Sequence, residues 1–397
     1  MPLMLFYFAY FFVTSIYVVV NMYLQVVFYN FGYGFEYVGL FQAVFEAAGI
    51  IGPILLGALA DRKGWYKQLC ILTLLVSGIS FYMLATDISL ILIFVSLLFF
   101  GFSFRAVSPI FDSFGTLSLG NKSERYSVYR AFGTLGFLII SAILAFFHKP
   151  DVDSNSNISF YYSLIVVVST IFVIILPTKD LKKNKALLEA KNEKRTSVEK
   201  EGKWYTKGFV IAMILIAFSR FSMTAIYSFL SLYSIEVVKY ENITMLNVVG
   251  SAFEFFIILL SGKLVKEKKI TPYTLIMIGT LAVAVRYSIY VLFPSVAGIL
   301  VGQALHCFCY GALHIGAILY ITKNVREDHR AMGLGIYYAA ATGLPAVIGS
   351  YLGGLIVANY GYNALFSSYA GVCLVALVFG LIFKKTLRAD SPFLIEN

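Results

Sequence analysis

Charge is scarce in this sequence. Lys, Arg, Asp and Glu make up 13% of the 397 residues, whereas a typical soluble domain has about 25%. Hydrophobic residues make up 59%, and the mean hydropathy is +0.82. Apolar runs follow one another along the chain, and each approaches the roughly 20 residues that a helix needs to cross a bilayer. The composition therefore argues against a soluble core and predicts an all-α integral membrane protein.

Cysteine and catalytic signatures are scarce as well. The four cysteines lie in apolar segments, and Cys307 and Cys309 form CxC rather than CxxC, so we expect neither a disulfide framework nor a metal site. There is no HExxH and no Walker motif. We therefore expect no enzyme activity, no cofactor and no ATP-driven step. The N-terminus lacks a basic n-region and a cleavage site, which predicts an uncleaved first span.

Apolar runs between polar breaks predict twelve transmembrane helices. They are expected at residues 3–29, 37–60, 68–86, 89–118, 127–148, 159–177, 208–235, 244–264, 272–293, 296–322, 332–358 and 364–383. Residues 1–178 and 208–383 would form two six-helix bundles, followed by a tail at 384–397. The hydrophilic stretch 179–207 has ten Lys/Arg and five Asp/Glu and is predicted to be a mobile or weakly helical linker.

The positions of Lys and Arg predict the orientation. If the N-terminus is cytoplasmic, 25 of the 31 Lys and Arg fall in cytoplasmic loops and the tail, four Arg fall within spans, and only Lys149 and Lys239 fall in loops on the other side. This asymmetry is the positive-inside pattern, so both termini are expected in the cytoplasm. The net charge of +10 then reflects orientation and contact with anionic lipids, not nucleic-acid binding.

The loop between the second and third predicted spans reads GALADRKGWYK, from Gly57 to Lys67. It resembles the motif G-x-L-x-D-R-x-G-R-K of the major facilitator superfamily, with Trp65 in place of the second Arg. The resemblance covers the whole chain. It implies two six-helix bundles, transport of a solute by alternating access, and a monomer; a plain basic interfacial turn is the alternative reading of this loop.

Each part of this loop has a physical role to fill. Gly57 is expected to let helices approach closely, and Gly64 to permit a tight turn. Asp61 would meet a helix N-terminus or a basic partner and favour one closed state of a cytoplasmic gate. The basic side chains are expected at the lipid headgroups: Arg62, Lys63 and Lys67.

Ionisable residues inside the spans are the candidate functional residues, because each costs about 2.5–3.5 kcal/mol at the centre of a span. The sequence Pro109-Ile-Phe-Asp112 is followed eighteen residues later by Arg130-Ala-Phe-Gly133-Thr-Leu-Gly136-Phe137. This resembles lactose permease and its relatives, with Asp for Glu, and with Phe137 where the permease has Trp. The resemblance implies that Asp112 and Arg130 face the solute; the alternative is two charges snorkelling to water.

A second set lies in the eighth to tenth spans. Glu254 and Arg286 are mid-span, and the oligosaccharide and proton symporters also have a Glu and an Arg there, with a His on the tenth helix; His306 would be the counterpart. The resemblance implies a proton or solute site. A buried structural ion pair between Glu254 and Arg286 is the alternative.

The tenth span contains QALHCFCYGALH, from Gln303 to His314, and resembles the phenylpropionate permease branch. Cys309 stands where lactose permease has its main proton-carrying Glu, so Glu254 or Glu46 would have to carry a proton, with His306 as a possible relay. Gln303 and His306 share a helix face, whereas His314 would lie about 80° away in a regular α-helix. A His bonded to a neighbouring helix is the alternative for both histidines.

Four further polar residues lie within the spans without matching a motif. Glu46 is either a second proton site or a partner of Arg220 or Arg105. Arg105 shares a helix face with Asp112. The amides Asn21 and Gln25 would line a cavity or join helices.

These observations favour a secondary transporter that takes up a small organic solute, an aromatic acid or a sugar-like molecule, together with protons. The excess of Arg within the spans favours an anionic or polyhydroxylated solute. The expected location is the inner membrane of a bacterial-type cell, and the expected partners are solute, protons and lipids. Efflux of drugs or sugars by proton antiport is the second hypothesis, although the fifth span lacks the glycine-proline motif of such antiporters. A non-transporting membrane sensor is the third.

Overall fold

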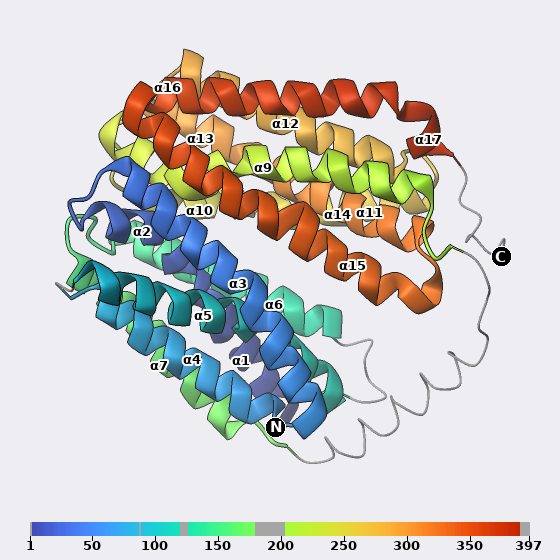
Figure 1. Ribbon diagram of the computed structural model, residues 1–397. Helices are drawn as coiled ribbons and strands as arrows, with labels where there is room; N and C mark the ends of the chain where they lie inside the picture. The colour runs from blue at the N-terminus through green and yellow to red at the C-terminus, as the bar shows by residue number, and fades with distance from the viewer. Residues whose placement is uncertain (1, 87–88, 120–125, 179–202, 390–397) are drawn as a thin grey trace. The chain divides into compact units, whose positions relative to one another are not determined.

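The computed structural model describes residues 2–86, 89–119, 126–178 and 203–389 (Figure 1). This part of the chain is helical and has no sheet; its one isolated β-bridge joins Tyr205 and Val325. The chain divides into two compact units. The first comprises Met1–Ser197 and Asn242–Asn247, and the second Val198–Glu241 and Val248–Asn397.

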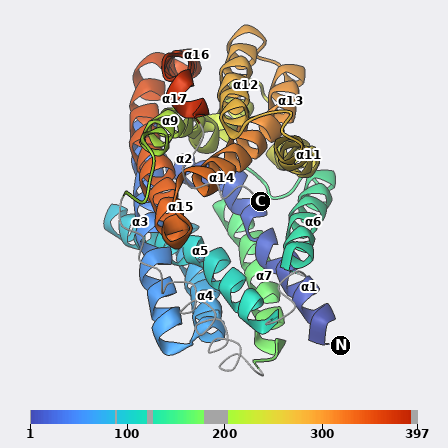
Figure 2. The same cartoon turned by 90° about the vertical axis from the view of Figure 1, so that its right-hand side faces the viewer.

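The first unit contains seven described helices between residues 2 and 175. They are α1 (Pro2–Ser15), α2 (Tyr17–Tyr29), α3 (Phe35–Lys63), α4 (Tyr66–Leu84), α5 (Leu90–Leu119), α6 (Tyr126–Phe146) and α7 (Asn155–Ile175). Helix α5 packs on both α3 and α4, and α1 packs on α6 and α7. Figures 1 and 2 both show α4 and α7 side by side.

The second unit is built around α9 (Lys207–Glu236) and α12 (Pro272–Leu292), which pack on the long α16 (Leu344–Ile382). The helix α10 (Ile243–Ala252) is divided between the units, with residues 243–247 in the first and 248–252 in the second. The other helical segments of the second unit are α11 (Glu254–Lys266), α13 (Val296–Ala304), η2 (Cys307–Ala312), α14 (Leu313–Asn324), η3 (Glu327–His329), α15 (Arg330–Tyr338), η4 (Ala339–Gly343) and α17 (Lys384–Arg388). Thus part of the expected tail, 384–388, is helical. Most of the expected linker, 179–202, lies outside the described residues.

Eleven helical stretches among the described residues are long and apolar enough to cross a membrane. The last, Met332–Ile382, has 51 residues, far more than the roughly 20 that one passage requires. It is broken at Gly361, whose φ of 76° and ψ of 179° are not helical. Predicted and observed boundaries elsewhere agree within a few residues.

Several predicted spans are interrupted rather than continuous. The first is divided at Ile16, and the eighth is divided at Phe253, directly before Glu254. The tenth and eleventh each contain a π-helical turn, at Cys307–Ala312 and Ala339–Gly343. Such turns are rare, leave an extra residue in the helical repeat and frequently occur at functional sites.

The distribution of side chains is that of a membrane protein. Large apolar residues such as Ile91 and Ile79 are 75% and 62% exposed, whereas many hydroxyl side chains are buried. Buried Ser169 donates to the carbonyl of Ile165, four residues earlier, which satisfies its hydroxyl within its own helix. Contiguous exposed apolar surface on many helices indicates contact with lipid.

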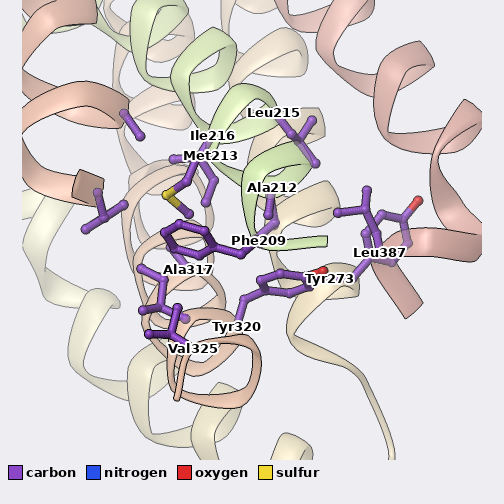
Figure 3. Packing of buried hydrophobic residues seen from close by; sticks show 14 of the residues in the cluster. Phe209, Ala212, Met213, Leu215, Ile216, Tyr273, Ala317, Tyr320, Val325 and Leu387 are labelled. Carbon is purple, nitrogen blue, oxygen red and sulfur yellow. The ribbon is translucent and has the colours of Figure 1, made fainter. Parts of the chain in front are cut away.

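The second unit has a compact apolar core at one end of α9. Phe209 of α9 packs close to Tyr320 and Val325, and Tyr273 lies near Leu387 (Figure 3). Because α14, α12 and α17 all contribute to this cluster, it holds the start of α9 against three other elements.

Two roles predicted for the Gly57–Lys67 loop require correction. A Cβ atom at Gly57 would have no neighbour within 4 Å, so this glycine does not mark a close helix approach within the described chain. Lys67 has protein partners in place of the lipid contact expected for it: its Nζ donates to the carbonyls of Ile174 and Leu176, both at 2.6 Å. A cation at the C-terminal end of α7 satisfies carbonyls that the helix leaves unpaired.

The close approach of α3 and α5 occurs instead at Gly52, where an added Cβ would overlap the carbonyl oxygen of Phe102. We expect Gly52→Ala to destabilise the protein by about 1–3 kcal/mol, because the helices must separate. Gly57→Ala is the matched control, since its Cβ would meet open space. Thermal unfolding in detergent measures both, and equal stability of the two variants would contradict the assignment.

Candidate functional site

The first unit brings Asp112 and Arg130 together. Nη1 of Arg130 on α6 donates to Oδ2 of Asp112 on α5, so the predicted pair is in contact. The Arg130 side chain is 57% exposed and that of Asp112 is 23% exposed. Both border a cavity of about 70 Å³. The cavity is lined by Tyr10, Val13, Thr14, Tyr17, Ser108, Phe111, Asp112, Arg130 and Thr134.

The two glycines that follow Arg130 bring α6 against α1. A Cβ at Gly133 would lie 2.5 Å from Oγ1 of Thr14, and one at Gly136 would overlap the carbonyl oxygen of Phe11. This contact explains why R-x-F-G-x-x-G needs glycine at both positions. Phe137 is half-buried and is not among the residues that line the cavity.

Glu46 pairs with Arg105, one of the two partners that the sequence left open. Nη2 of Arg105 lies 2.5 Å from Oε1 of Glu46, and Nε2 of Gln42 donates to the same oxygen at 3.2 Å. The guanidinium also lies 5.0 Å from the ring centroid of Phe45. Glu46 thus has two donors and a neutralising cation.

The two amides of α2 are linked through the main chain of Asn21. Gln25 is buried, and its Nε2 donates to the main-chain oxygen of Asn21 at 3.3 Å. The Asn21 side chain is exposed. This arrangement tests neither of the two roles considered for the pair.

In the second unit, Arg286 on α12 is fully buried. Its guanidinium donates from Nε to Tyr290 Oη at 2.6 Å, from Nη2 to Oε1 of Gln303, and from Nη1 to Nδ1 of His306 at 3.3 Å. Tyr290 also offers its ring face, with the centroid 5.5 Å away. Arg286 is therefore in contact with His306, which the sequence grouped with it, and with Gln303, which it did not. No ion pair joins Arg286 to Glu254 among the described residues.

The contact with Arg286 determines the tautomer of His306. A guanidinium only donates, so Nδ1 of His306 must accept, and its ring proton resides on Nε2. Protonating Nδ1 would place two cations 3.3 Å apart. In this arrangement His306 is therefore a neutral donor through Nε2.

The π-helical turn aligns the histidines, contrary to the expectation for His314. A regular α-helix would place His314 about 80° from His306. Instead, the rings of His306 and Tyr310 stack with centroids 5.8 Å apart, and those of Tyr310 and His314 stack at 5.4 Å. The wider turn at Cys307–Ala312 rotates the following residues backward, so the three rings form one column.

The far end of this column is held by a second buried arginine. Arg220 on α9 is 4% exposed, and its Nη2 donates to Tyr337 Oη at 2.7 Å. Because that oxygen accepts from Arg220, its own proton is available to Nδ1 of His314, 2.9 Å away. Arg220 also lies 5.2 Å from the ring centroid of Tyr310. We call His306, Tyr310 and His314 with these two arginines the ring column.

Glu254 begins α11 directly after the break in the eighth span, and its side chain is half-buried. Its Cγ lies 3.6 Å from the Cβ position of Gly311 in the π-helical turn. Among the residues that the structure describes, no hydrogen bond or ion pair reaches its carboxylate.

The loop from Gly57 to Lys67 has the turn that its sequence predicts. Gly64 has a φ of 70°, in the left-handed region that glycine tolerates. Asp61 accepts a hydrogen bond from Tyr66 Oη at 2.8 Å, and Arg62 is exposed. A role of Asp61 in gating remains a prediction.

The sequence-based candidate set omitted Tyr290, Tyr310 and Tyr337, and it treated Arg220 only as a partner for Glu46. A signal for Tyr290 and Tyr310 was present: each follows a candidate, Arg286 or His306, by four residues and so shares its helix face. Tyr337 had no such signal, because its link to His314 depends on how α15 packs.

A sequence model described as the MFS_1 like family matches residues 1–368. None of the curated protein sequences matches the chain. Solved structures are similar in fold. The nucleoside transporter NupG is 16% identical, with a TM-score of 0.76 over 98% of this chain and 99% of that one. The xylose transporter XylE from E. coli, in an inward-open conformation, is 14% identical, with a TM-score of 0.70 over 98% and 96%.

A third solved structure is that of a POT family transporter in complex with a thioalcohol-conjugated peptide. It is 14% identical, with a TM-score of 0.73 over 97% of this chain and 96% of that one. At such identities the likeness concerns the fold alone. All three similarities span nearly the full length of the chain.

Tyr337→Phe tests the link between Arg220 and His314. It removes the only oxygen that Arg220 is shown to bond, so we expect a loss of about 1–3 kcal/mol from an unsatisfied buried donor. Tyr360→Phe, at a position that is 76% exposed, should leave stability unchanged. Thermal unfolding in detergent compares them, and an unaffected Tyr337→Phe protein would show that the hydroxyl does not hold the column.

Proposed function

We propose that this chain, which belongs to the MFS_1-like family, is a secondary transporter that takes up a small organic solute together with protons. We further propose a place in the phenylpropionate and lactose permease branch, a monomeric state, alternating access, and the inner membrane of a bacterial-type cell as the location. The support for the branch is the set of motifs on the fourth, fifth and tenth spans.

We propose twelve membrane passages with both termini in the cytoplasm. The break at Gly361 divides Met332–Ile382 into two parts, each close to the length of one passage. Counted this way, the eleven membrane-crossing stretches become twelve. An even number places both termini on one side, and the positions of Lys and Arg favour the cytoplasmic side.

Glu254 is the proposed proton carrier. The proposal of proton coupling is supported by the absence of a cationic partner for this carboxylate among the described residues. A residue that binds and releases a proton must be stable in both forms, which a permanent cation partner prevents. Glu46 has such a partner in Arg105, and Asp112 has one in Arg130. Glu254 has none among the described residues and stands at a helix break beside the π-helical turn.

The proposed solute is an aromatic acid or a sugar-like molecule. In the first unit, the Asp112–Arg130 pair and several hydroxyl groups border the cavity. In the second unit, the ring column offers aromatic faces and the Nε2 donor of His306. Arginine, hydroxyl and imidazole donors suit carboxylate or hydroxyl groups, and ring faces suit an apolar ring.

The first experiment measures proton entry into proteoliposomes offered a phenylpropionate-type acid, a disaccharide or a nucleoside, one at a time. In Glu254→Gln we expect solute-driven proton influx to disappear while solute counterflow persists, because glutamine resembles the protonated carboxyl and cannot release a proton. The exposed Glu267, which pairs with Lys269, provides the control: Glu267→Gln should behave as the parent.

Three other outcomes would change the proposal. Influx that survives in Glu254→Gln would transfer the proton site to Glu46 or Asp112. Counterflow with no proton movement in the parent would indicate a facilitator or another coupling ion. Proton movement opposite to that of the solute would indicate antiport and efflux. Protein-free vesicles control for passive entry of weak acids.

Asp112→Asn tests the pair in the first unit. The change removes the charge that Arg130 contacts, and a charge-assisted hydrogen bond contributes about 1.5–3 kcal/mol, so we expect uptake to fall by about tenfold or more in a protein that remains folded. Asp153→Asn, in an exposed loop, is the matched control. Parental uptake by Asp112→Asn would remove this residue from the solute pathway.

A further inference from the structure

Arg220 has few acceptors for a buried guanidinium. It lies in the middle of α9 and is 4% exposed. Its Nη2 donates to Tyr337 Oη at 2.7 Å, and its Nη1 reaches only the thioether sulfur of Met223, at 3.9 Å. Its Nε is buried and has no hydrogen-bond partner among the described residues. A guanidinium carries five N–H donors, and only one of them meets an oxygen of the described chain.

The other three arginines within the spans are better provided with partners. Arg105 and Arg130 each pair with a carboxylate of the first unit. Arg286 has no carboxylate, but each of its three guanidinium nitrogens bonds a side chain. In the part of the chain that the structure describes, Arg220 thus has neither a carboxylate nor a complete set of hydrogen bonds.

The surroundings of Arg220 are aromatic and neutral. The ring centroids of Tyr310 and Tyr337 lie 5.2 and 5.9 Å from its guanidinium carbon. Its strongest electrostatic neighbours are the phenol groups of Tyr337, Tyr227 and Tyr310. Ring faces attract a cation but do not cancel its charge, and a buried charge without an opposite charge is costly. Water would satisfy the N–H groups and leave the charge uncompensated.

The helical segments around Arg220 are irregular. Tyr310 belongs to the π-helical turn η2, and a second π-helical turn, η4, begins two residues after Tyr337 and packs on α9. In η4 the hydroxyl of Thr342 is also buried without a hydrogen-bond partner among the described residues. Two elements that pack together, α9 and η4, thus each contain a buried donor that has no acceptor in the described chain.

The rings beside Arg220 are only partly covered. Tyr310, whose ring contacts the guanidinium, is half-buried, as is His314, which stacks on it. Tyr338, which follows Tyr337, is 53% exposed. The guanidinium therefore lies one side chain away from accessible surface.

We propose that Arg220, together with Tyr310 and Tyr337, forms a binding site for a small monovalent anion. The anion accepts a hydrogen bond from Nε and supplies the negative charge that the described neighbours lack. One guanidinium in neutral surroundings is balanced by one such charge. Inorganic chloride and the carboxylate of an organic solute share this chemistry. The site itself does not depend on transport; only its assignment to the carboxylate of a solute rests on the proposed function.

Thermal unfolding of the full-length protein in detergent tests the site, because a ligand that binds the folded state raises the unfolding temperature. The probes are sodium chloride, sodium phenylpropionate and the neutral phenylpropionamide. The buffer is free of chloride, and sodium methanesulfonate keeps its ionic strength constant. We expect a saturable rise of about 2–4 °C with at least one of the two anions and none with the amide.

Two variants assign the rise to Arg220. Arg220→Gln removes the charge and should abolish the rise. Arg388→Gln is the matched control, because Arg388 is an exposed arginine of α17 in the same unit, and it should respond as the parent does. If Arg220→Gln does not fold, Arg220→Lys takes its place. Lysine keeps the charge and loses the Nε donor, so we expect about tenfold weaker binding of the anion.

Several results would overturn the site. They are no rise with either anion, a rise that persists in Arg220→Gln, and an anion affinity that is unchanged in Arg220→Lys. A rise with phenylpropionate alone that the amide reproduces would show binding of the phenyl ring and would overturn the site as well.

The probes also distinguish the source of the anion. A rise with chloride alone indicates a resident inorganic anion, and a rise with phenylpropionate alone indicates the carboxylate of a solute. Solute counterflow tests transport separately. If no solute is transported, the proposed function fails, and the unfolding result still decides whether the site exists. Counterflow of a disaccharide without any anion-dependent rise would retain the transporter and remove the site.

Discussion

A buried guanidinium in a membrane-spanning helix must keep its N–H groups bonded, because lipid offers no acceptors. Arg286 imposes this constraint on the second unit, and it is met by Tyr290, Gln303 and His306 rather than by a carboxylate. Arg220 likewise bonds a neutral partner, Tyr337, through Nη2, but its buried Nε has no hydrogen-bond partner among the described residues. Both guanidinium groups keep their charge, so the unit holds two cations whose partners are neutral. Glu254 is consequently left as a carboxylate that has no fixed partner among the described residues.

The π-helical turn at Cys307–Ala312 lets the tenth span contact Arg286 directly, through His306, and Arg220 indirectly, through His314 and Tyr337. A regular helix would direct His306 and His314 to different faces, and only one could join a column of rings. The wider turn lets His306 reach Arg286 while His314 reaches Tyr337. The first unit uses direct ion pairs instead, with Arg130 on Asp112 and Arg105 on Glu46. The two units therefore stabilise intramembrane charge by different chemistry.

Much of the fold and part of the candidate site could be predicted from the sequence. Helix positions follow from apolar runs, because the bilayer demands about 20 such residues per passage. The sequence predicted Asp112 and Arg130 as one functional pair, and it grouped Arg286 and His306 with Glu254 in one site. The bond between Arg286 and Gln303 was not predicted. The close approach assigned to Gly57 was wrong, since helix crossings depend on packing; Gly52 and Gly136 mark them instead. The lipid-facing role of Lys67 was wrong because the carbonyls it meets belong to a distant helix end.

The sequence by itself determined that this is an all-α membrane protein, and it determined which intramembrane residues are charged. Burial of charge in lipid is costly enough that every such residue stands out in an apolar run. Only the tertiary structure decided the partners: Arg105 for Glu46, Tyr337 for Arg220, and no ion pair between Glu254 and Arg286. Partner choice depends on angles between helices and on local departures from 3.6 residues per turn. Those departures arise from packing among helices far apart in the chain, which no local pattern encodes.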